Sequence, residues 1–388
     1  MTYRTMLIKN AFRNRFRSIL TITGIGVAIL AFVFLRTVVD VWNSGLTAAA
    51  EDRLVTRHKV SITMLLPRTY YDRMGNQPNV SSIGYANWFG ATYPKDEHSF
   101  FANFAVDDDN YLNVYPEIVV PPDQLAAWKA DPAGAIVGQT LAAKYGWKLG
   151  DKVTLTGTIY PGDWTFNVCA FYTTTNRAID KSSFLFHWKY LNDGPISDRM
   201  REQVGWLVIR VKDPSQGSAV AGAIDSMFES SEAQTLTESE RAFNLSFISM
   251  YAAIFTAMDV VSVVILLIMT MIVGNTIAMG VRERTHEYGV LRAIGFTPRH
   301  LMVLIFGESL FITAIGGALG LLIALPIVNG FGKFIEDNLG SFFPYFAISS
   351  GTVALAAVLA LVVGLASAVL PAWTAARLQV TMALRRLG

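Results

Sequence analysis

The sequence has little of what soluble enzymes and disulfide-stabilised domains are built from. Only 16% of its 388 residues are charged, and the single cysteine, Cys169, excludes an intrachain disulfide. The net charge of +2 argues against the broad basic surface of a nucleic-acid-binding protein. There is no G-x-x-x-x-G-K-[ST], H-E-x-x-H or G-x-S-x-G motif. We therefore predict no nucleotide-binding or catalytic site and no cofactor in this chain.

The hydrophobic residues are concentrated in four long segments that are nearly free of charge. These segments are 18–35, 260–281, 301–328 and 347–373, and Glu308 is the one charged residue within them. Each reaches the length of about 20 residues that crosses the hydrocarbon core of a bilayer. We predict four transmembrane helices, the first an uncleaved anchor because it is long for a signal peptide.

The basic residues flank these segments on one side. Five precede the first segment without an acidic neighbour, and four arginines follow the second, between residues 282 and 299. The positive-inside rule then predicts a multi-pass membrane protein with both termini in the cytoplasm. Between the first two segments, short runs rich in Val, Ile, Thr and aromatics alternate with helical patterns.

The predicted fold class is an α-helical membrane protein with four transmembrane helices and a large extracytoplasmic α+β domain between the first and second. Strands are expected at 58–64, 99–106, 151–159, 163–172 and 205–213, and helices at 121–131, 136–145 and 214–230. The expected parts are a cytoplasmic basic helix (1–17), transmembrane helix 1 (18–43), the α+β domain (44–236), a stalk with transmembrane helix 2 (237–281), a cytoplasmic helical loop (282–300), transmembrane helix 3 (301–329), a short outer loop (330–346), transmembrane helix 4 (347–376) and a cytoplasmic tail (377–388).

Two features of the outer segment have alternative interpretations. The run 107–110, Asp-Asp-Asp-Asn, resembles a calcium loop but lacks the EF-hand glycine and distal glutamate, so an acidic surface turn is favoured. Aromatic residues could line a ligand groove, although their strand-like spacing is more typical of a core. These aromatics are Trp88, Phe89, Phe100, Phe101 and Phe104.

Some charged and small residues in or near the predicted spans also have two possible roles. Arg36 and Asp259 fall at the outer interface, where they either snorkel or take part in a gate. Glu308 either snorkels inward or pairs with a cytoplasmic arginine. Gly316 and Gly320 have the spacing that lets helices pack closely, within one chain or between subunits.

The loop 281–300, VRERTHEYGVLRAIGFTPRH, is densely charged. Val290, Leu291 and Ile294 have the spacing of an amphipathic helix, while Gly295 and Pro298 predict where that helix stops. Either the helix docks a cytoplasmic partner, or the loop is simply solvated, because the positive-inside rule alone would produce its charge.

This region resembles the signature of the MacB/FtsX-like ABC transporter permeases, the type VII, mechanotransmission-type membrane subunits. The resemblance extends to the segments 136–155 and 370–388 and to the N-terminal helix leading into the first span. The matching residues of the signature are Glu283, Arg284, Thr285, Glu287, Gly289, Arg292, Ala293 and Gly295, followed by Gly316, Gly317 and Gly320 of the third span.

The resemblance implies that the loop is a coupling helix seated on a separate ABC ATPase, present in two copies, which binds ATP and magnesium. Only about 17 residues precede the first span, so the ATPase is expected on another chain. The resemblance also implies a second permease copy or paralogue, and it allows a periplasmic adaptor or outer-membrane component. The residues expected to couple to the ATPase are Arg282, Glu283, Arg284, Thr285, Glu287, Tyr288, Gly289, Arg292 and Gly295.

The leading functional hypothesis is therefore a permease subunit that couples ATP hydrolysis elsewhere to movements of its outer domain, for export or extraction of a substrate. The alternative is a membrane-anchored regulator, either an FtsX-like activator of a cell-wall hydrolase or a sensor, without transport. Tyr288 and Phe296 depart from the aliphatic or small residues frequent in MacB-like members. Residues 65–115 match nothing familiar, and choice of substrate or partner is expected there.

Overall fold

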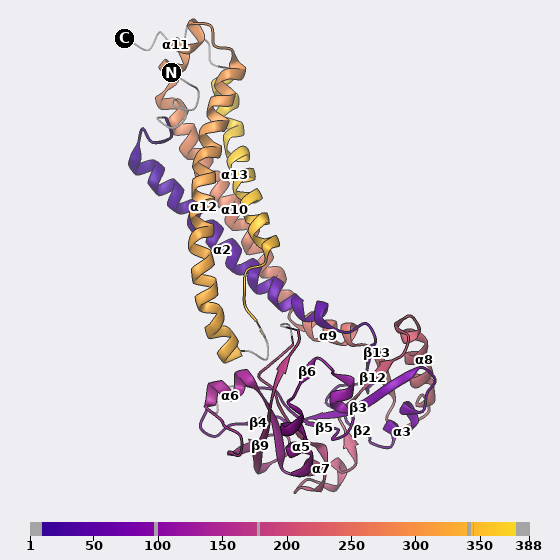
Figure 1. Cartoon of the computed structure of the whole chain (residues 1–388). Helices are drawn as coiled ribbons and strands as arrows, with labels where there is room; N and C mark the ends of the chain where they lie inside the picture. Colours follow the sequence, from indigo (N-terminus) through magenta and orange to yellow (C-terminus); the bar gives the residue numbers. More distant parts are fainter. Residues whose placement is uncertain (1–9, 97–99, 177–178, 340–342, 344, 378–388) are drawn as a thin grey trace. The chain divides into compact units, whose positions relative to one another are not determined.

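A computed structural model describes residues 10–96, 100–176, 179–339, 343 and 345–377 (Figure 1). The chain divides into two compact units. The helical unit comprises residues 1–40, 252–331 and 347–388, and the α/β unit comprises residues 41–251 and 332–346. The predicted tail beyond residue 377 and the first nine residues lie outside the described part of the chain.

Long apolar helices build the helical unit. Four helical segments are long and apolar enough to cross a membrane, as predicted. Residues 10–11 are helical, a turn follows, and the first long helix begins at Arg15, a few residues before the expected start of the span. The helices are α2 (Arg15–Ala48), α10 (Ala252–Glu283), α11 (Thr285–Ala293), α12 (Pro298–Leu339) and α13 (Ser350–Ala376).

An eleven-stranded mixed sheet is the frame of the α/β unit. The strand order is β13-β1-β12-β3-β5-β10-β7-β9-β8-β4, with β6 paired to β9, and a separate ladder joins β11 to β2. The strands are β1 (Arg53–His58), β2 (Leu66–Pro67), β3 (Val80–Trp88), β4 (Ala91–Thr92), β5 (Asn103–Val106), β6 (Ile118–Val119), β7 (Gly134–Gly138), β8 (Lys152–Gly157), β9 (Gly162–Thr174), β10 (Phe184–His187), β11 (Gln203–Val204), β12 (Trp206–Val211) and β13 (Thr235–Ser239).

Short helices lie between these strands, and one more follows the last strand. They are α3 (Tyr70–Gly75), α4 (Tyr111–Val114), α5 (Pro122–Ala130), α6 (Gln139–Tyr145), α7 (Trp188–Asp193), α8 (Gly217–Met227) and α9 (Glu240–Met250), with 3₁₀ turns η1 (Asp198–Met200) and η2 (Pro214–Gln216). The pairs β5–β10 and β7–β9 are parallel, whereas the other described ladders are antiparallel. The predicted α+β class is confirmed.

Two apolar clusters stabilise the α/β unit, and three of the five aromatic residues expected in a core or a groove pack in or against them. Phe89 and Phe101 are fully buried in the larger cluster, and Phe104 packs against the smaller one. Trp88 and Phe100 instead stack on each other at the surface, with centroids 5.9 Å apart. Core packing, the favoured alternative, therefore holds for three of these five residues.

The prediction of a strand at 58–64 is wrong. The strand lies earlier in the chain, at Arg53–His58. β1 is paired on both sides, with β12 and β13. The Lys59 N–H donates to the Gln234 carbonyl where this ladder ends. Beyond that point Val60 is 77% exposed, so the apolar residues of 60–64 have no partner strand.

The stalk helix expected from residue 237 begins later, at Glu240. Residues Thr235–Ser239 form β13 instead, because they pair with β1 and Thr237 donates from both its N–H and its hydroxyl to Asp225. The helix expected at 136–145 starts at Gln139, after the buried strand β7. A short apolar run such as Ile136–Val137 suits either structure, so neighbouring strands decide it.

Candidate functional site

The loop between α10 and α12 folds into the short helix α11, Thr285–Ala293. The helix ends in a Schellman motif at Gly295, whose φ is +106°. The Gly295 N–H donates to the Arg292 carbonyl at 3.2 Å, and the Phe296 N–H donates to the Leu291 carbonyl at 3.0 Å. Glycine adopts this left-handed conformation without a Cβ clash. The predicted helix stop at Gly295 is therefore confirmed.

A buried ion pair anchors α11 to α12. Arg284, at the junction of α10 and α11, has Nη1 2.9 Å from Oε2 of Glu308 and Nη2 2.5 Å from Oε1. Both residues are only 7% exposed. The two parallel contacts form the bidentate geometry that Arg and carboxylates favour. Glu308 was expected either to snorkel or to pair with an arginine, and in the structure it pairs with Arg284.

Two further ion pairs connect the loop to the N-terminal segment. Arg17 pairs with Glu283, and Arg13 pairs with Glu287. Both pairs are partly exposed, so each contributes about 0–1 kcal/mol to stability. They instead fix the position of the loop, because they attach the segment at the start of α2 to residues 283–287.

The other predicted coupling residues have varied surroundings. Tyr288 and Gly289 are buried, and burial raises the pKa of Tyr288 to about 12. Arg292 donates to the carbonyl of the last residue of α13 at 3.3 Å. The Thr285 hydroxyl donates to a backbone carbonyl one turn earlier, and Arg282 lines a cavity between α10 and α13.

The exposed surface of α11 is polar at His286 and Glu287 and apolar toward its C-terminal end. Val290 is 41% exposed and Ile294, just beyond the last helical residue, is 68% exposed. Residues four apart lie on one face of a helix, so the two side chains form one patch. The spacing of Val290 and Ile294 predicts their place on an amphipathic face, but neither is among the residues expected to couple to the ATPase.

Gly316, Gly317 and Gly320 lie where α12 meets its neighbours. A Cβ at Gly316 would lie 2.7 Å from the Cβ of Ile25 on α2, and one at Gly320 would lie 2.6 Å from the Gly26 carbonyl. Gly317 faces α13 at similarly close range. In Figure 1, α2 crosses α12 at a steep angle, which this close approach permits. The structure thus uses these glycines for packing within one chain.

Polar side chains connect three helices at the other end of the helical unit. Arg36 Nε lies 3.0 Å from Asp40 Oδ1, and Arg36 Nη1 lies 3.7 Å from Asp259 Oδ1 on α10. The Thr352 hydroxyl, in the first turn of α13, donates to Asp40 Oδ2 at 2.5 Å. Arg36 and Asp259 therefore contact each other, an arrangement compatible with either of their predicted roles.

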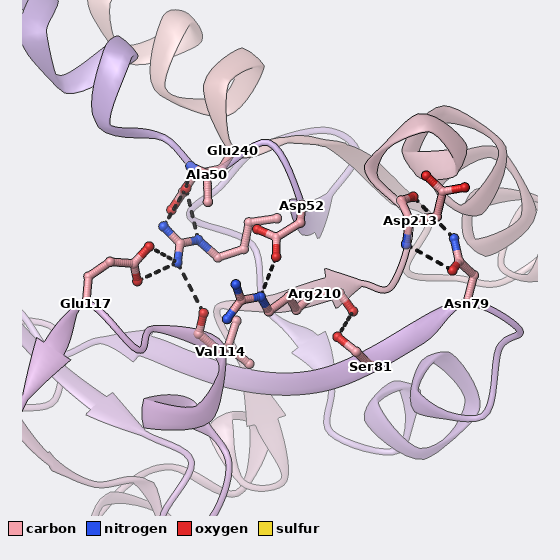
Figure 2. Close-up of polar contacts among 10 residues, drawn as sticks. Ala50, Asp52, Asn79, Ser81, Val114, Glu117, Arg210, Asp213 and Glu240 are labelled. Carbon is pink, nitrogen blue, oxygen red and sulfur yellow. Dashed lines mark hydrogen bonds and ion pairs between the residues drawn. The ribbon is translucent and has the colours of Figure 1, made fainter.

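A buried arginine, Arg53, connects the segments by which the chain enters and leaves the α/β unit, and Figure 2 shows two of its partners, Glu117 and Glu240. Arg53, the first residue of β1, is 2% exposed. Its Nε and Nη2 donate to Glu240 at 2.9 Å, and its Nη1 donates to Glu117 at 2.9 Å and to the Val114 carbonyl at 3.1 Å. Figure 2 also shows the Ala50 N–H, which donates to the same carboxylate of Glu240 at 2.9 Å.

This Arg53 network joins two segments that are far apart in sequence. Ala50 lies between α2 and β1, and Glu240 is the first residue of α9, directly after β13. Burial opposes the charge of Arg53, but Glu240 and Glu117 offset it and raise the pKa of Arg53 above its usual range. The guanidinium therefore stays charged and holds both connecting segments.

Sequence reasoning missed the Arg53 network. Arg53 begins a strand among other charged residues, and Glu117 and Glu240 lie 64 and 187 positions away. A charged residue of this kind is usually solvated, and no local pattern distinguishes it. Only the pairing of β1 with β13 brings Arg53 and Glu240 together.

The acidic run at 107–110 is not simply a surface turn. Asp107 is buried, and burial raises its pKa to about 6. Asp108 Oδ1 lies 2.9 Å from Nδ1 of buried His187, while exposed Asp109 approaches Lys129. Among the described residues, no cluster of three or more His, Cys, Asp or Glu side chains is suited to a metal ion. The calcium alternative has no support there.

Comparisons with known proteins found a matching family model and several sequence relatives. A sequence model described as the FtsX-like permease C-terminal domain matches residues 260–380. The chain is 25% identical over 285 residues to an uncharacterized ABC transporter permease of Mycobacterium tuberculosis, covering 68% of this chain and 30% of that protein. It is 33% identical over 128 residues to the macrolide export ATP-binding/permease protein MacB of Bordetella avium, covering 33% and 19%. The predicted resemblance to MacB/FtsX-like permeases is confirmed.

Two further relatives complete this comparison. An uncharacterized ABC transporter permease of Bacillus subtilis is 34% identical over 114 residues, covering 29% of this chain and 26% of that protein. The periplasmic region of MacB from Actinobacillus actinomycetemcomitans aligns with 52% of this chain and 95% of its own length, with a TM-score of 0.38 and 6% identity. This chain spans less than a third of the length of each of the three sequence relatives.

We predict that Arg53→Met lowers the free energy of unfolding of the α/β unit by about 3–5 kcal/mol, because the buried carboxylate of Glu240 and the partly exposed carboxylate of Glu117 lose their partner. Urea unfolding of the full chain in detergent, followed by tryptophan fluorescence, measures this, since six of the eight tryptophans lie between residues 88 and 206. Arg210→Met is the matched control, because its pair with Asp52 is partly exposed and is worth about 1 kcal/mol. Equal losses for both variants would contradict the special role of Arg53.

We also predict a pH dependence that originates from Asp107. Its pKa is about 6 in the fold against 3.8 in the unfolded chain, so the stability that protonation contributes is complete below pH 3.8 and is lost as pH rises through 6. Relative to Asp107→Asn, the wild-type chain should gain about 1 kcal/mol of stability between pH 7 and pH 5. The same urea titration measures it, and a difference that does not change with pH would rule the assignment out.

Proposed function

We propose that this chain is the permease subunit of an ABC transporter in the bacterial inner membrane. A separate ATPase, which binds ATP and magnesium, docks on α11, and this chain catalyses no reaction itself. Two ATPase copies and a second permease copy or paralogue complete the assembly. ATP-driven movement of α11 is passed to the α/β unit and exports or extracts a substrate. The match of residues 260–380 to the FtsX-like permease domain supports this class of function.

The docking position is argued from a difference between the charged and the apolar residues in and beside α11. The charges of Glu283, Arg284 and Glu287 are occupied by partners within this chain. Val290 and Ile294 are instead left exposed on a helix that lies outside the four apolar spans. An exposed apolar patch fixed on a short helix is a surface suited to a groove in a partner protein. The predicted coupling residues thus act mainly by holding the helix in place.

The proposal also needs a route for the movement. Arg284 connects α11 to α12 through Glu308, and the pairs of Arg13 and Arg17 connect the loop to the segment that begins α2. The chain then runs from α2 into β1 and from β13 into α9, at the two connections that Arg53 holds together. A displacement of α11 reaches the α/β unit through these covalent connections.

We predict that Ile294→Asp weakens binding of the ATPase at least tenfold, because a charge at the centre of an apolar contact costs more than about 1.4 kcal/mol. The measurement is capture of Walker-motif proteins from native membranes by the tagged chain, followed by titration of the ATPase so identified.

The matched control is Thr297→Asp, which adds the same charge in the same loop but beyond α11. Thr297 is exposed, and Asp also serves as an N-terminal cap for the helix that follows, so ATPase binding should stay at the wild-type level. Capture of no ATPase by the wild-type chain would refute the permease proposal. Unchanged binding by Ile294→Asp would refute only the docking surface.

A further inference from the structure

A cavity of about 530 Å³ opens on the surface of the helical unit between α10 and α13. Its floor is made by small residues, among them Gly274 and Ala278 on α10 and Ser367 on α13. A Cβ at Gly274 would lie 3.3 Å from the Ser367 carbonyl, so the two helices touch there. Outside the groove, α10 carries large exposed side chains such as Leu267 and Ile268. The small residues therefore create a groove in an otherwise bulky apolar surface.

The groove has the length of one membrane leaflet. Its lining residues on α10 run from Thr270 to Arg282, which is about 18 Å at 1.5 Å per residue. Half of a typical hydrocarbon core is about 15 Å. One end therefore lies near mid-membrane and the other, at Arg282, reaches the headgroup region. By the positive-inside rule this is the cytoplasmic leaflet, where anionic lipids are attracted to basic residues.

Two polar side chains in the groove have no partner among the described residues. Arg282 forms no ion pair or side-chain hydrogen bond there, in contrast to Arg13, Arg17 and Arg284 nearby. Asn275 lies two turns deeper on α10 and is exposed among apolar residues. An amide left unsatisfied in hydrocarbon costs several kcal/mol. The groove therefore offers one cation and one amide to a ligand that is otherwise apolar.

We propose that this groove binds an anionic glycerophospholipid. One acyl chain lies against Gly274 and Ala278, an ester carbonyl accepts from the Asn275 amide, and the phosphate pairs with the Arg282 guanidinium. Phosphate and guanidinium form strong charge-assisted hydrogen bonds. The proposal needs only that the four apolar helices lie in a membrane with Arg282 on the cytoplasmic side, and it is independent of the docking of an ATPase.

A second copy of the chain fits the groove less well than a lipid. Two copies inserted in the same direction and related by an axis along the membrane normal would bring the same faces together at the same depth. An interface built on this groove would bury the Arg282 of both copies, and none of the residues that line the groove is acidic, so the groove itself would leave both charges unpaired. A phosphate instead neutralises each arginine.

The test measures lipid binding to the delipidated full chain in detergent by native mass spectrometry, with phosphatidylglycerol and phosphatidylcholine of identical chains. The wild-type chain should bind one phosphatidylglycerol in preference to phosphatidylcholine. Arg282→Gln should weaken phosphatidylglycerol binding about tenfold and abolish the preference, as expected for the loss of one charge-assisted contact. Ala278→Phe, which fills the groove, should weaken binding of both lipids.

Two controls separate the groove from the rest of the surface. Arg299→Gln removes an exposed arginine of the same loop, and Leu322→Phe enlarges an exposed residue of α12 that does not line the groove. Neither should change lipid binding. Wild-type binding by Arg282→Gln, or by Ala278→Phe, would overturn the proposal. So would an efficient disulfide between two copies carrying Asn275→Cys in a Cys169→Ala background, because a second copy would then occupy the groove.

Discussion

The buried ion pair between Arg284 and Glu308 is the contact on which the helical unit depends at its α11 end. Removing two charges from water is expensive, and their attraction offsets that cost only when the geometry is good and both partners are present. Here both charges are almost completely buried and meet in a bidentate pair. The pair fixes the junction of α10 and α11 against α12, so α11 is a rigid part of the helical unit and not a loosely attached loop.

The α/β unit repeats this device with Arg53. A single guanidinium binds carboxylates from two distant parts of the chain and, through Glu240, the backbone of the segment that leads in from α2. In both units a buried arginine therefore connects separate secondary-structure elements. The surfaces that we propose for a partner and a ligand are instead mostly apolar, as at Ile294 and in the groove that holds Asn275 and Arg282.

Sequence reasoning predicted the features that depend on local composition and periodicity. The four apolar helices, the α+β character of the intervening segment and the stop of α11 at Gly295 follow from hydrophobic length, strand-forming residues and glycine conformation. It erred where long-range pairing decides the structure, as when β13 replaces the start of a helix because β1 lies beside it. The family resemblance named Arg284 as a coupling residue, and the structure shows that its charge is directed inward to Glu308.

The central claim is that the Arg284–Glu308 pair transmits movement of α11, and a double-mutant cycle tests it most directly. The quantity to measure is the stimulation of the ATPase by the permease in nanodiscs, for Arg284→Met, Glu308→Met and the double variant that carries both substitutions. Each single variant should bind the ATPase but lose most of the stimulation, because one buried charge is left without its partner. The double variant should recover part of it, since no unpaired charge remains. Wild-type stimulation in both single variants would contradict the account.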